Sequence, residues 1–186
     1  MTTLHTERLT LREWHLDDFE TLAAFLADDT ANQYRGPGHG LTRNEAWSHL
    51  CEVIGQWHLR GYGEFAIEES ESRQVMGWAG LWHPIFLDEP ELSWSLFPAA
   101  QGKGYATEAA VSVQRWAAED LDLPPLFSFV HPDNLPSRKL AERLGAVLEG
   151  QQEFRGQPRL LYRHRDLKSS NSNQSNQQEK ELTCQS

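Results

Sequence analysis

The sequence predicts an α+β fold built on one mixed, mostly antiparallel central sheet that is flanked by helices. Two observations lead to this prediction. A hairpin pattern fills the middle of the chain, and a single strand–helix–strand crossover follows it. The crossover turns at Gly102 and Gly104, which flank a lysine. A doubly wound sheet would instead require several such crossovers in succession.

The first 60 residues are expected to form one strand and two helices. Leucines alternate with polar residues over 8–14, as in a half-buried strand, and Asp17 and Asp18 open a short helix. Thr42 and Glu45 form a capping box at the start of the second helix. We expect one face of that helix to be apolar and buried, with Trp47, Leu50, Cys51, Ile54 and Trp57.

The rest of the folded chain is expected to alternate between strands and helices. A polar turn joins strands at 64–68 and 74–82, and a third strand follows at 91–97. The glycine turn opens an Ala-rich helix at 106–118, and a buried strand is expected at 126–131. A short helix and two last strands are expected at 136–144, 146–149 and 159–163.

Length and composition suit one folded domain over residues 1–168. The chain has 186 residues, 39% of them hydrophobic, which allows a sizeable core. Residues 169–186 lose almost all apolar side chains, so we expect a disordered polar tail there. There is no run of about 18 apolar residues and no apolar N-terminal segment. We therefore expect a cytoplasmic protein with no membrane contact.

Charge and cysteine content narrow the classes of ligand. The formal net charge of −10 disfavours nucleic acid as a partner, because phosphate neutralisation needs clustered Lys and Arg. An acidic surface would instead attract a cationic acceptor such as an amine. Cys51 and Cys184 form neither a disulfide framework nor a metal-ligand spacing, so no metal is expected.

The glycine turn is typical of an anion site. Gly102 and Gly104 allow backbone N–H groups to approach a phosphate, and the first turn of a helix has N–H groups without intrahelical partners. Lys103 adds a positive charge. A plain tight turn is the alternative reading. The spacing matches neither a P-loop nor a dinucleotide fingerprint, because Thr107 stands where the third glycine would be.

Seven short motifs occur in an order that resembles the GNAT N-acetyltransferase superfamily over about residues 6–166. Within it, the chain is most similar to the branch of the ribosomal-protein alanine/serine N-acetyltransferases. The motifs are Glu-Arg-Leu-Thr-Leu-Arg (7–12), Phe-Ala-Ile-Glu (65–68), Gly-Trp-Ala-Gly-Leu (77–81), Glu-Leu-Ser-Trp-Ser-Leu-Phe-Pro (91–98), Gln-Gly-Lys-Gly-Tyr-Ala-Thr-Glu-Ala (101–109), His-Pro-Asp-Asn-Leu-Pro-Ser (131–137) and Leu-Ala-Glu-Arg-Leu-Gly-Ala (140–146).

The resemblance implies acetyl-CoA as cosubstrate and a primary amine as acceptor, either a protein N-terminus or a small molecule. The amine is expected to attack the acetyl group directly in a ternary complex. A homodimer is compatible with it. The cofactor is expected between the strand before the glycine turn and the strand after its helix. The residues implied to bind it are Leu96, Phe97, Gln101, Gly102, Lys103, Gly104, Tyr105, Ala106, Asn134 and Ser137.

Two residues are expected to carry the chemistry. Glu91 is the first choice as the base that takes the amine proton, and Ser137 is the acid that protonates the departing thiolate. Many relatives have a tyrosine where this chain has Ala141, which cannot donate a proton. Ser137 as a plain helix cap is the alternative. Glu68, Glu153, His83 and His131 are weaker candidates for proton transfer, and Glu68 is expected on a solvated face.

Several questions stay open at this level. The losses at Ala99 and Ala141 leave a non-catalytic acyl-CoA binding or sensor module of the same fold as the alternative function. Two further groups of residues have either a functional or a plain structural reading. They are the basic cluster Arg138, Lys139 and Arg143, which would hold the cofactor phosphates, and the tryptophans Trp78, Trp82 and Trp94, one of which would line the acceptor site.

Overall fold

The computed structural model describes residues 2–36 and 38–168, so the expected tail at 169–186 lies outside it. Eight strands form one sheet in the order β1-β2-β3-β4-β5-β6-β8-β7. The strands are β1 (Leu4–His5), β2 (Leu9–Arg12), β3 (Glu64–Glu69), β4 (Val75–Trp82), β5 (Glu91–Leu96), β6 (Phe127–Val130), β7 (Val147–Phe154) and β8 (Gln157–Arg163). All neighbours pair antiparallel except β5 and β6. The predicted fold class is confirmed.

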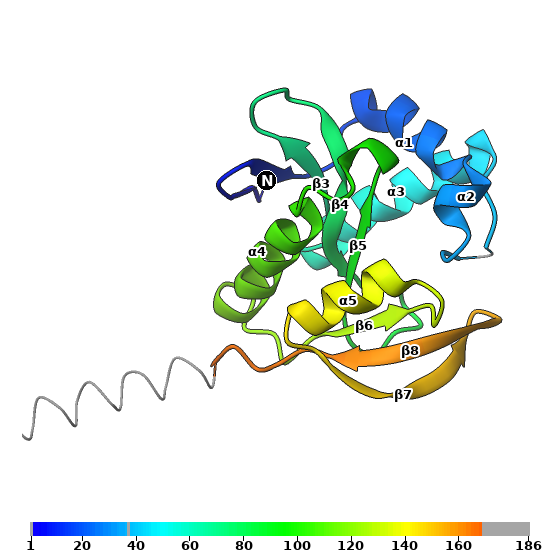
Figure 1. The fold of residues 1–186 in the computed structure, drawn as a ribbon. Helices are drawn as coiled ribbons and strands as arrows, with labels where there is room; N and C mark the ends of the chain where they lie inside the picture. Colours follow the sequence, from blue (N-terminus) through cyan, green and yellow to red (C-terminus); the bar gives the residue numbers. More distant parts are fainter. Residues whose placement is uncertain (1, 37, 169–186) are drawn as a thin grey trace, which may run out of the picture.

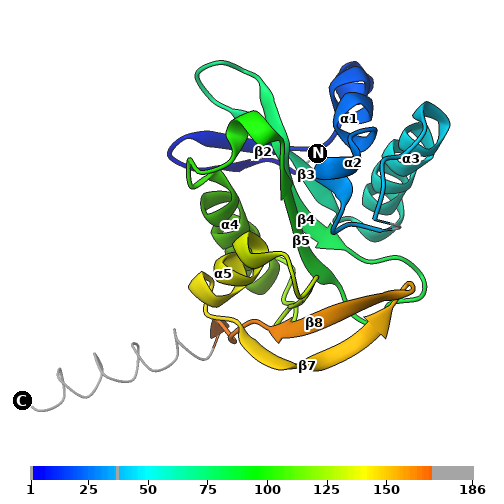
Figure 2. The same ribbon diagram turned by 45° about the vertical axis from the view of Figure 1, so that its right-hand side comes forward.

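Helices cover both faces of this sheet (Figures 1 and 2). The first three α-helices lie on one face, and α4 and α5 lie on the other. Strands β3 and β4 are therefore buried along nearly their whole length. The helices are η1 (Leu16–Asp18), α1 (Phe19–Leu26), α2 (Asp29–Asn32), α3 (Arg43–Arg60), η2 (Pro98–Ala100), α4 (Tyr105–Glu119) and α5 (Leu135–Arg143). None of the helices in the described ranges is long and apolar enough to cross a bilayer.

Helix α3 confirms its predicted start but not its predicted buried face. Thr42 and Glu45 make the reciprocal hydrogen bonds of a capping box, and Gly61 ends the helix at φ +74°. The buried side chains are Ala46, Leu50, Val53 and Trp57. Trp47, Cys51 and Ile54, expected in the core, are exposed. The buried face includes Ala46 and Val53. The sequence analysis missed both because the residues next to them, Trp47 and Ile54, are larger and more hydrophobic.

The C-terminal hairpin is longer than the sequence suggested. The strand expected at 146–149 continues to Phe154, and its side chains are almost all exposed. Such a polar strand lacks the apolar alternation that marks a half-buried strand. It forms because β8 pairs with it along its whole length. The turn between them, at Arg155 and Gly156, becomes part of the site described next.

Candidate active site

The sheet opens between its two parallel strands. β5 and β6 share only one backbone pairing, Glu91 with Phe127, whereas β5 pairs with β4 over six residues. Beyond that point, side chains bridge the strands. Glu91 Oε1 accepts a hydrogen bond from the Phe129 N–H (2.9 Å), and Ser128 Oγ donates to the Leu92 carbonyl (2.6 Å). The strands therefore leave a wedge-shaped gap between them that widens toward Leu96. The sequence analysis expects the cofactor at this place.

Leu96 and Phe97 differ in how their backbones are used. The Phe97 N–H donates to the Met76 carbonyl on β4, and the Phe97 carbonyl accepts from the Ala100 N–H, both at 2.9 Å. The Leu92 carbonyl points the other way, toward β6. Since backbone direction alternates along a strand, the groups of Trp94 and Leu96 also face the gap. Phe97 therefore has no free backbone donor for a ligand, which removes the backbone part of the role expected for it.

The predicted glycine turn lies at the wide end of the gap. Gly102 and Gly104 have φ of +77° and +84°, and Gly104 is the N-cap of α4 with no side chain capping the helix. A side chain at Gly102 would meet no atom within 4 Å, so the turn is open. Its Tyr105 and Ala106 N–H groups begin the helix and have no intrahelical partner. This arrangement fits a phosphate group.

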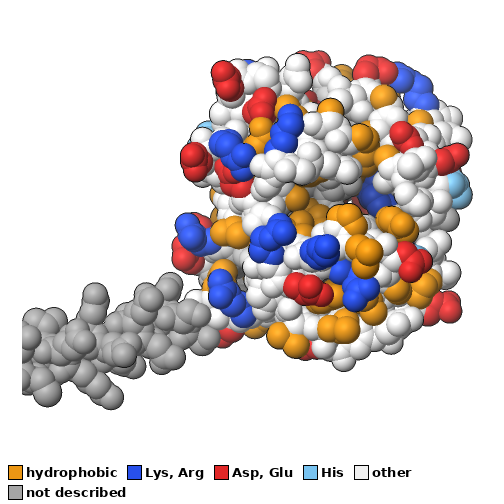
Figure 3. Space-filling model, viewed as in Figure 1, with side chains coloured by type: hydrophobic (Ala, Val, Ile, Leu, Met, Phe, Trp, Pro, Cys, Tyr) orange, Lys and Arg blue, Asp and Glu red, His pale blue; other side chains and the backbone are white. Residues whose placement is uncertain are grey.

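Basic side chains surround this turn. Arg8 donates to the Lys103 carbonyl at 2.9 Å, and Arg143 of α5 donates to Thr107 Oγ1 at 3.1 Å. Lys and Arg side chains gather over α4 and α5 on the face seen in Figure 3. Arg138 is tied to the Pro132 carbonyl, while Lys139 is exposed. Arg8 is paired with Glu108 at 2.6 Å, so Lys103 and Arg143 are the basic side chains at the turn that remain available to an anion.

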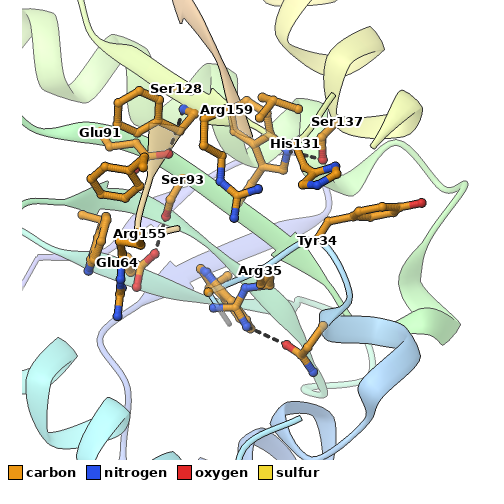
Figure 4. Close-up of a pocket in the computed structure, with 18 of the residues that line it drawn as sticks. Tyr34, Arg35, Glu64, Glu91, Ser93, Ser128, His131, Ser137, Arg155 and Arg159 are labelled. Atoms are coloured by element: carbon orange, nitrogen blue, oxygen red, sulfur yellow. Dashed lines mark hydrogen bonds between the residues drawn. The ribbon is translucent and has the colours of Figure 1, made fainter. Parts of the chain in front are cut away.

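A pocket of about 400 Å³ occupies the narrow end of the gap. Its walls come from the loop after α2, from α3, from β3 to β6, from the start of α5 and from the β7–β8 hairpin (Figure 4). Trp78, Trp82 and Trp94 all line it, where the sequence analysis expected one tryptophan. Its size and aromatic walls suit a small organic acceptor.

Glu91 lies in this pocket and is 8% exposed. Burial raises the pKa of its carboxyl from 4.5 to about 8, and the hydrogen bond from Phe129 opposes the rise. Glu64 adds to the rise in the Glu91 pKa, and Arg159 reduces it. A carboxylate with a pKa near the working pH is suited to general-base catalysis.

Glu64 is a second buried carboxyl in the pocket, and the sequence analysis gave it no role. It is 6% exposed, and it accepts a hydrogen bond from Ser93 Oγ. Burial raises the pKa of Glu64 as well, with Ser93 and Arg35 acting in the opposite direction. It sits on β3, two strands away from Glu91, so only the folded sheet brings the two carboxyls into one pocket.

Ser137 lines the opposite end of the pocket, at the start of α5 (Figure 4). Its Oγ accepts a hydrogen bond from Trp94 Nε1 at 3.4 Å. The N-cap of α5 is Asn134, whose Oδ1 accepts from the Ser137 N–H at 3.2 Å. The capping role considered for the Ser137 side chain therefore belongs to Asn134. Ala141 is fully buried and offers no proton donor.

The weaker proton-transfer candidates fall into different environments. Glu68 was expected on a solvated face, but it is 3% exposed and pairs with Arg12 at 2.7 Å and Arg73 at 2.9 Å. His83 bonds to Tyr62 outside the pocket, and Glu153 is exposed on β7. His131 does line the pocket, with its ring 5.1 Å from that of Tyr34.

Three arginines in the pocket were not anticipated: Arg35, Arg155 and Arg159. Arg35 follows α2, Arg155 is in the β7–β8 turn, and Arg159 is on β8. Arg155 and Arg159 are 120 or more positions away from Arg35 in the sequence, so only the folded chain shows that the three share one pocket. A partial signal is present at Arg159, a charged residue that opens an otherwise apolar strand segment.

Comparison with known proteins agrees with this geometry. The family model described as an acetyltransferase (GNAT) domain matches residues 8–147. The N-acetyltransferase p20 of Bacillus licheniformis is 30% identical over 155 residues, which cover 81% of this chain and 85% of that protein. An acetyltransferase structure from Agrobacterium tumefaciens has a TM-score of 0.79 at 35% identity, covering 89% of this chain and 95% of its own.

A more distant structure shares the fold alone. It is RimL, a ribosomal L7/L12 alpha-N-protein acetyltransferase in complex with coenzyme A, with a TM-score of 0.73 at 18% identity. The alignment covers 88% of this chain and 97% of that one.

Proposed function

The chain belongs to the GNAT acetyltransferase family and is an N-acetyltransferase, and from that premise we propose that it transfers the acetyl group of acetyl-CoA to a primary amine by direct attack in a ternary complex. The acceptor is a small-molecule amine or a protein N-terminus. The observation that carries the proposal is the pocket between β5 and β6, which holds a buried Glu91 at one end and Ser137 at the other.

The donor site is supported by the geometry at the wide end of the gap. Acetyl-CoA would supply an acetyl group activated as a thioester. Backbone N–H groups from Gly102 to Ala106 would bind its pyrophosphate, helped by the charge of Lys103, and Leu96 would present its N–H to the arm. The Gln101 N–H donates to the Pro98 carbonyl, and its side chain donates to the Leu96 carbonyl, so Gln101 would act by positioning these groups. Asn134 uses Oδ1 for its cap, which leaves the amide nitrogen to donate to the same arm. Phe97 would contribute packing alone.

The residues at the two ends of the pocket suggest how the acetyl group is transferred to the amine. The amine nitrogen forms a C–N bond with the acetyl carbon while the C–S bond breaks. Glu91 takes the proton that the amine loses, and Ser137 Oγ gives a proton to the sulfur and regains one from water. A carboxyl with a pKa of about 8 is partly ionised at neutral pH, so it can accept this proton and release it again.

A thiol-release assay tests the proposal. We expect the purified chain to release coenzyme A thiol from acetyl-CoA only when an amine acceptor is present, and the Glu91→Gln variant to lose most of this activity. Calorimetric binding of acetyl-CoA without thiol release from any amine would favour the binding-module alternative instead. We also propose that the protein is cytoplasmic. A homodimer is compatible with the proposed function, and sedimentation of the purified chain would detect it.

A further inference from the structure

The acceptor pocket holds cationic side chains that have no carboxylate partner. Within the described residues, no ion pair involves Arg35, Arg155 or Arg159. Arg159 is 6% exposed, and its Nη1 has no hydrogen-bond partner in the described part of the chain. A buried, unpaired guanidinium is costly unless something supplies negative charge.

The other two arginines are held in place by contacts that leave their charge available. Arg35 lies 4.4 Å from the centre of the Trp78 ring and donates to Asn32 Oδ1 at 2.9 Å. Arg155 lies 5.9 Å from the Trp82 ring. Figure 4 shows Arg159 reaching from β8 toward the middle of the pocket, with Arg35 on the facing wall. All three side chains line the same pocket.

The acidic residues of the pocket do not balance this charge. Burial raises the pKa of Glu91 to about 8, so this carboxyl is mostly protonated near pH 7, and burial raises the pKa of Glu64 as well. Glu45 is engaged in the cap of α3, and Glu52 is exposed. Among the histidines that line the pocket, His49 has a pKa lowered by burial to about 4 and adds no charge of its own.

We propose that the acceptor is an amino acid, whose carboxylate is bound by Arg159 together with Arg35 and Arg155 while its amine faces Glu91. This inference rests on the proposed function. Arg159 and Glu91 line the same pocket, so one small molecule can place an anion on Arg159 and an amine at Glu91. An α-amino acid is such a molecule. A guanidinium is also the side chain best matched to a carboxylate, through paired N–H donors.

The proposal reverses one expectation from composition. The net charge of −10 suggested a cationic acceptor, but a polyamine would bring further positive charge against three arginines. Local charge in a partly buried pocket outweighs the mean charge of a solvated surface, because solvent screens the latter more strongly.

The experiment compares one pair of acceptors that differ only in the carboxylate, together with a polyamine and an acidic peptide. Thiol release is measured with L-phenylalanine, L-phenylalaninamide, spermidine and the tripeptide Asp-Ala-Ala. We expect kcat/KM for phenylalanine to exceed that for its amide by more than about tenfold, although the amide has the less basic amine. Equal values for acid and amide, or a preference for spermidine, would overturn the proposal. A preference for the acidic tripeptide over phenylalanine would overturn the assignment to a free amino acid.

Variants on one strand supply the matched control. Arg159→Gln is expected to bring the acid-to-amide ratio down to about one. Arg163→Gln, four residues along β8 and paired with Glu89 outside the pocket, should keep the ratio. Arg155→Asn, on the exposed turn, should lower the ratio as well and serves if the Arg159 variant does not fold. An unchanged ratio in folded Arg159→Gln contradicts the inference.

Product binding separates this inference from the proposed function. Calorimetry in the presence of coenzyme A compares N-acetyl-L-phenylalanine with its amide, which needs no turnover. Carboxylate-dependent binding that is lost in Arg159→Gln supports the inference even if no amine is acetylated. Acetylation of amines with no carboxylate dependence of rate or product binding leaves the proposed function standing and rejects the inference.

Discussion

Replacing Glu91 by glutamine should stabilise the protein at alkaline pH while it removes catalysis. The folded pocket raises the pKa of Glu91 from 4.5 to about 8. Below pH 4.5 the carboxyl is protonated in both the folded and the unfolded chain, and its burial has no ionisation cost. Between pH 4.5 and 8 the unfolded chain releases the proton that the folded chain keeps, so the free energy of unfolding falls as pH rises.

The size of this effect follows from the two pKa values. Their difference corresponds to about 5 kcal/mol, reached in full above pH 8. Glutamine cannot ionise, and its amide oxygen can still accept the hydrogen bond from Phe129. We therefore expect Glu91→Gln to gain up to about 5 kcal/mol over the parent protein at pH 9 and less than about 1 kcal/mol at pH 5.

Urea unfolding of both proteins at pH 5, 7 and 9 measures this difference. Glu153→Gln, which changes an exposed carboxyl on β7, is the matched control and should show no such trend. A gain from Glu91→Gln that is the same at pH 5 and pH 9 would refute the reasoning, because it would mean that Glu91 ionises as easily in the folded protein as in the unfolded one.

Three other outcomes are expected. The value of kcat/KM should rise with pH and level off above about 8, because Glu91 then loses its proton. Glu91→Gln should remove this rise and lower turnover by about 10²–10⁴-fold in rate assays. Ser137→Ala should lower turnover by about tenfold or more, with little change in melting temperature. Asn134→Ala should instead lower the free energy of unfolding by about 1 kcal/mol in thermal unfolding, because Asn134 caps α5. Gly104→Val should weaken acetyl-CoA binding more than about tenfold by calorimetry. Gly61→Val, at a similar positive φ at the end of α3, is the control and should lower stability alone. Equal acetyl-CoA affinities in the two variants would exclude the glycine turn as the phosphate site.

The sequence predicted the elements whose signals are local. Capping by Thr42 and Glu45, the hairpin of β3 and β4, and the glycine turn before α4 each depend on a few neighbouring residues, and the structure has all three. The order of these elements and the motif resemblance were enough for the fold class. β1 was missed because a strand of two residues carries no period.

The site could be predicted only in part, because its residues meet through tertiary contacts. Glu68 looked solvated beside Glu69 and Glu71, but the sheet buries it against Arg12. Arg159 was predicted only as the first residue of a strand at 159–163. Its burial depends on the polar strand β7 outside it and on the gap beside β6, neither of which leaves a periodic trace in the sequence.

The single backbone pairing between β5 and β6 also affects how the molecule opens. A small hydrophobic cluster, made of Val130, Ala141, Ala146, Leu160 and Tyr162, is separate from the main core, and Trp94 packs against both. We expect β6, α5, β7 and β8 to exchange their amide hydrogens as one cooperative unit, at a lower free energy than the strands β2 to β4. A ligand that spans the gap binds only the closed arrangement, so its binding energy adds to the cost of opening. The last third of the chain would then owe part of its protection against local unfolding, and against proteolysis, to a molecule that the protein consumes.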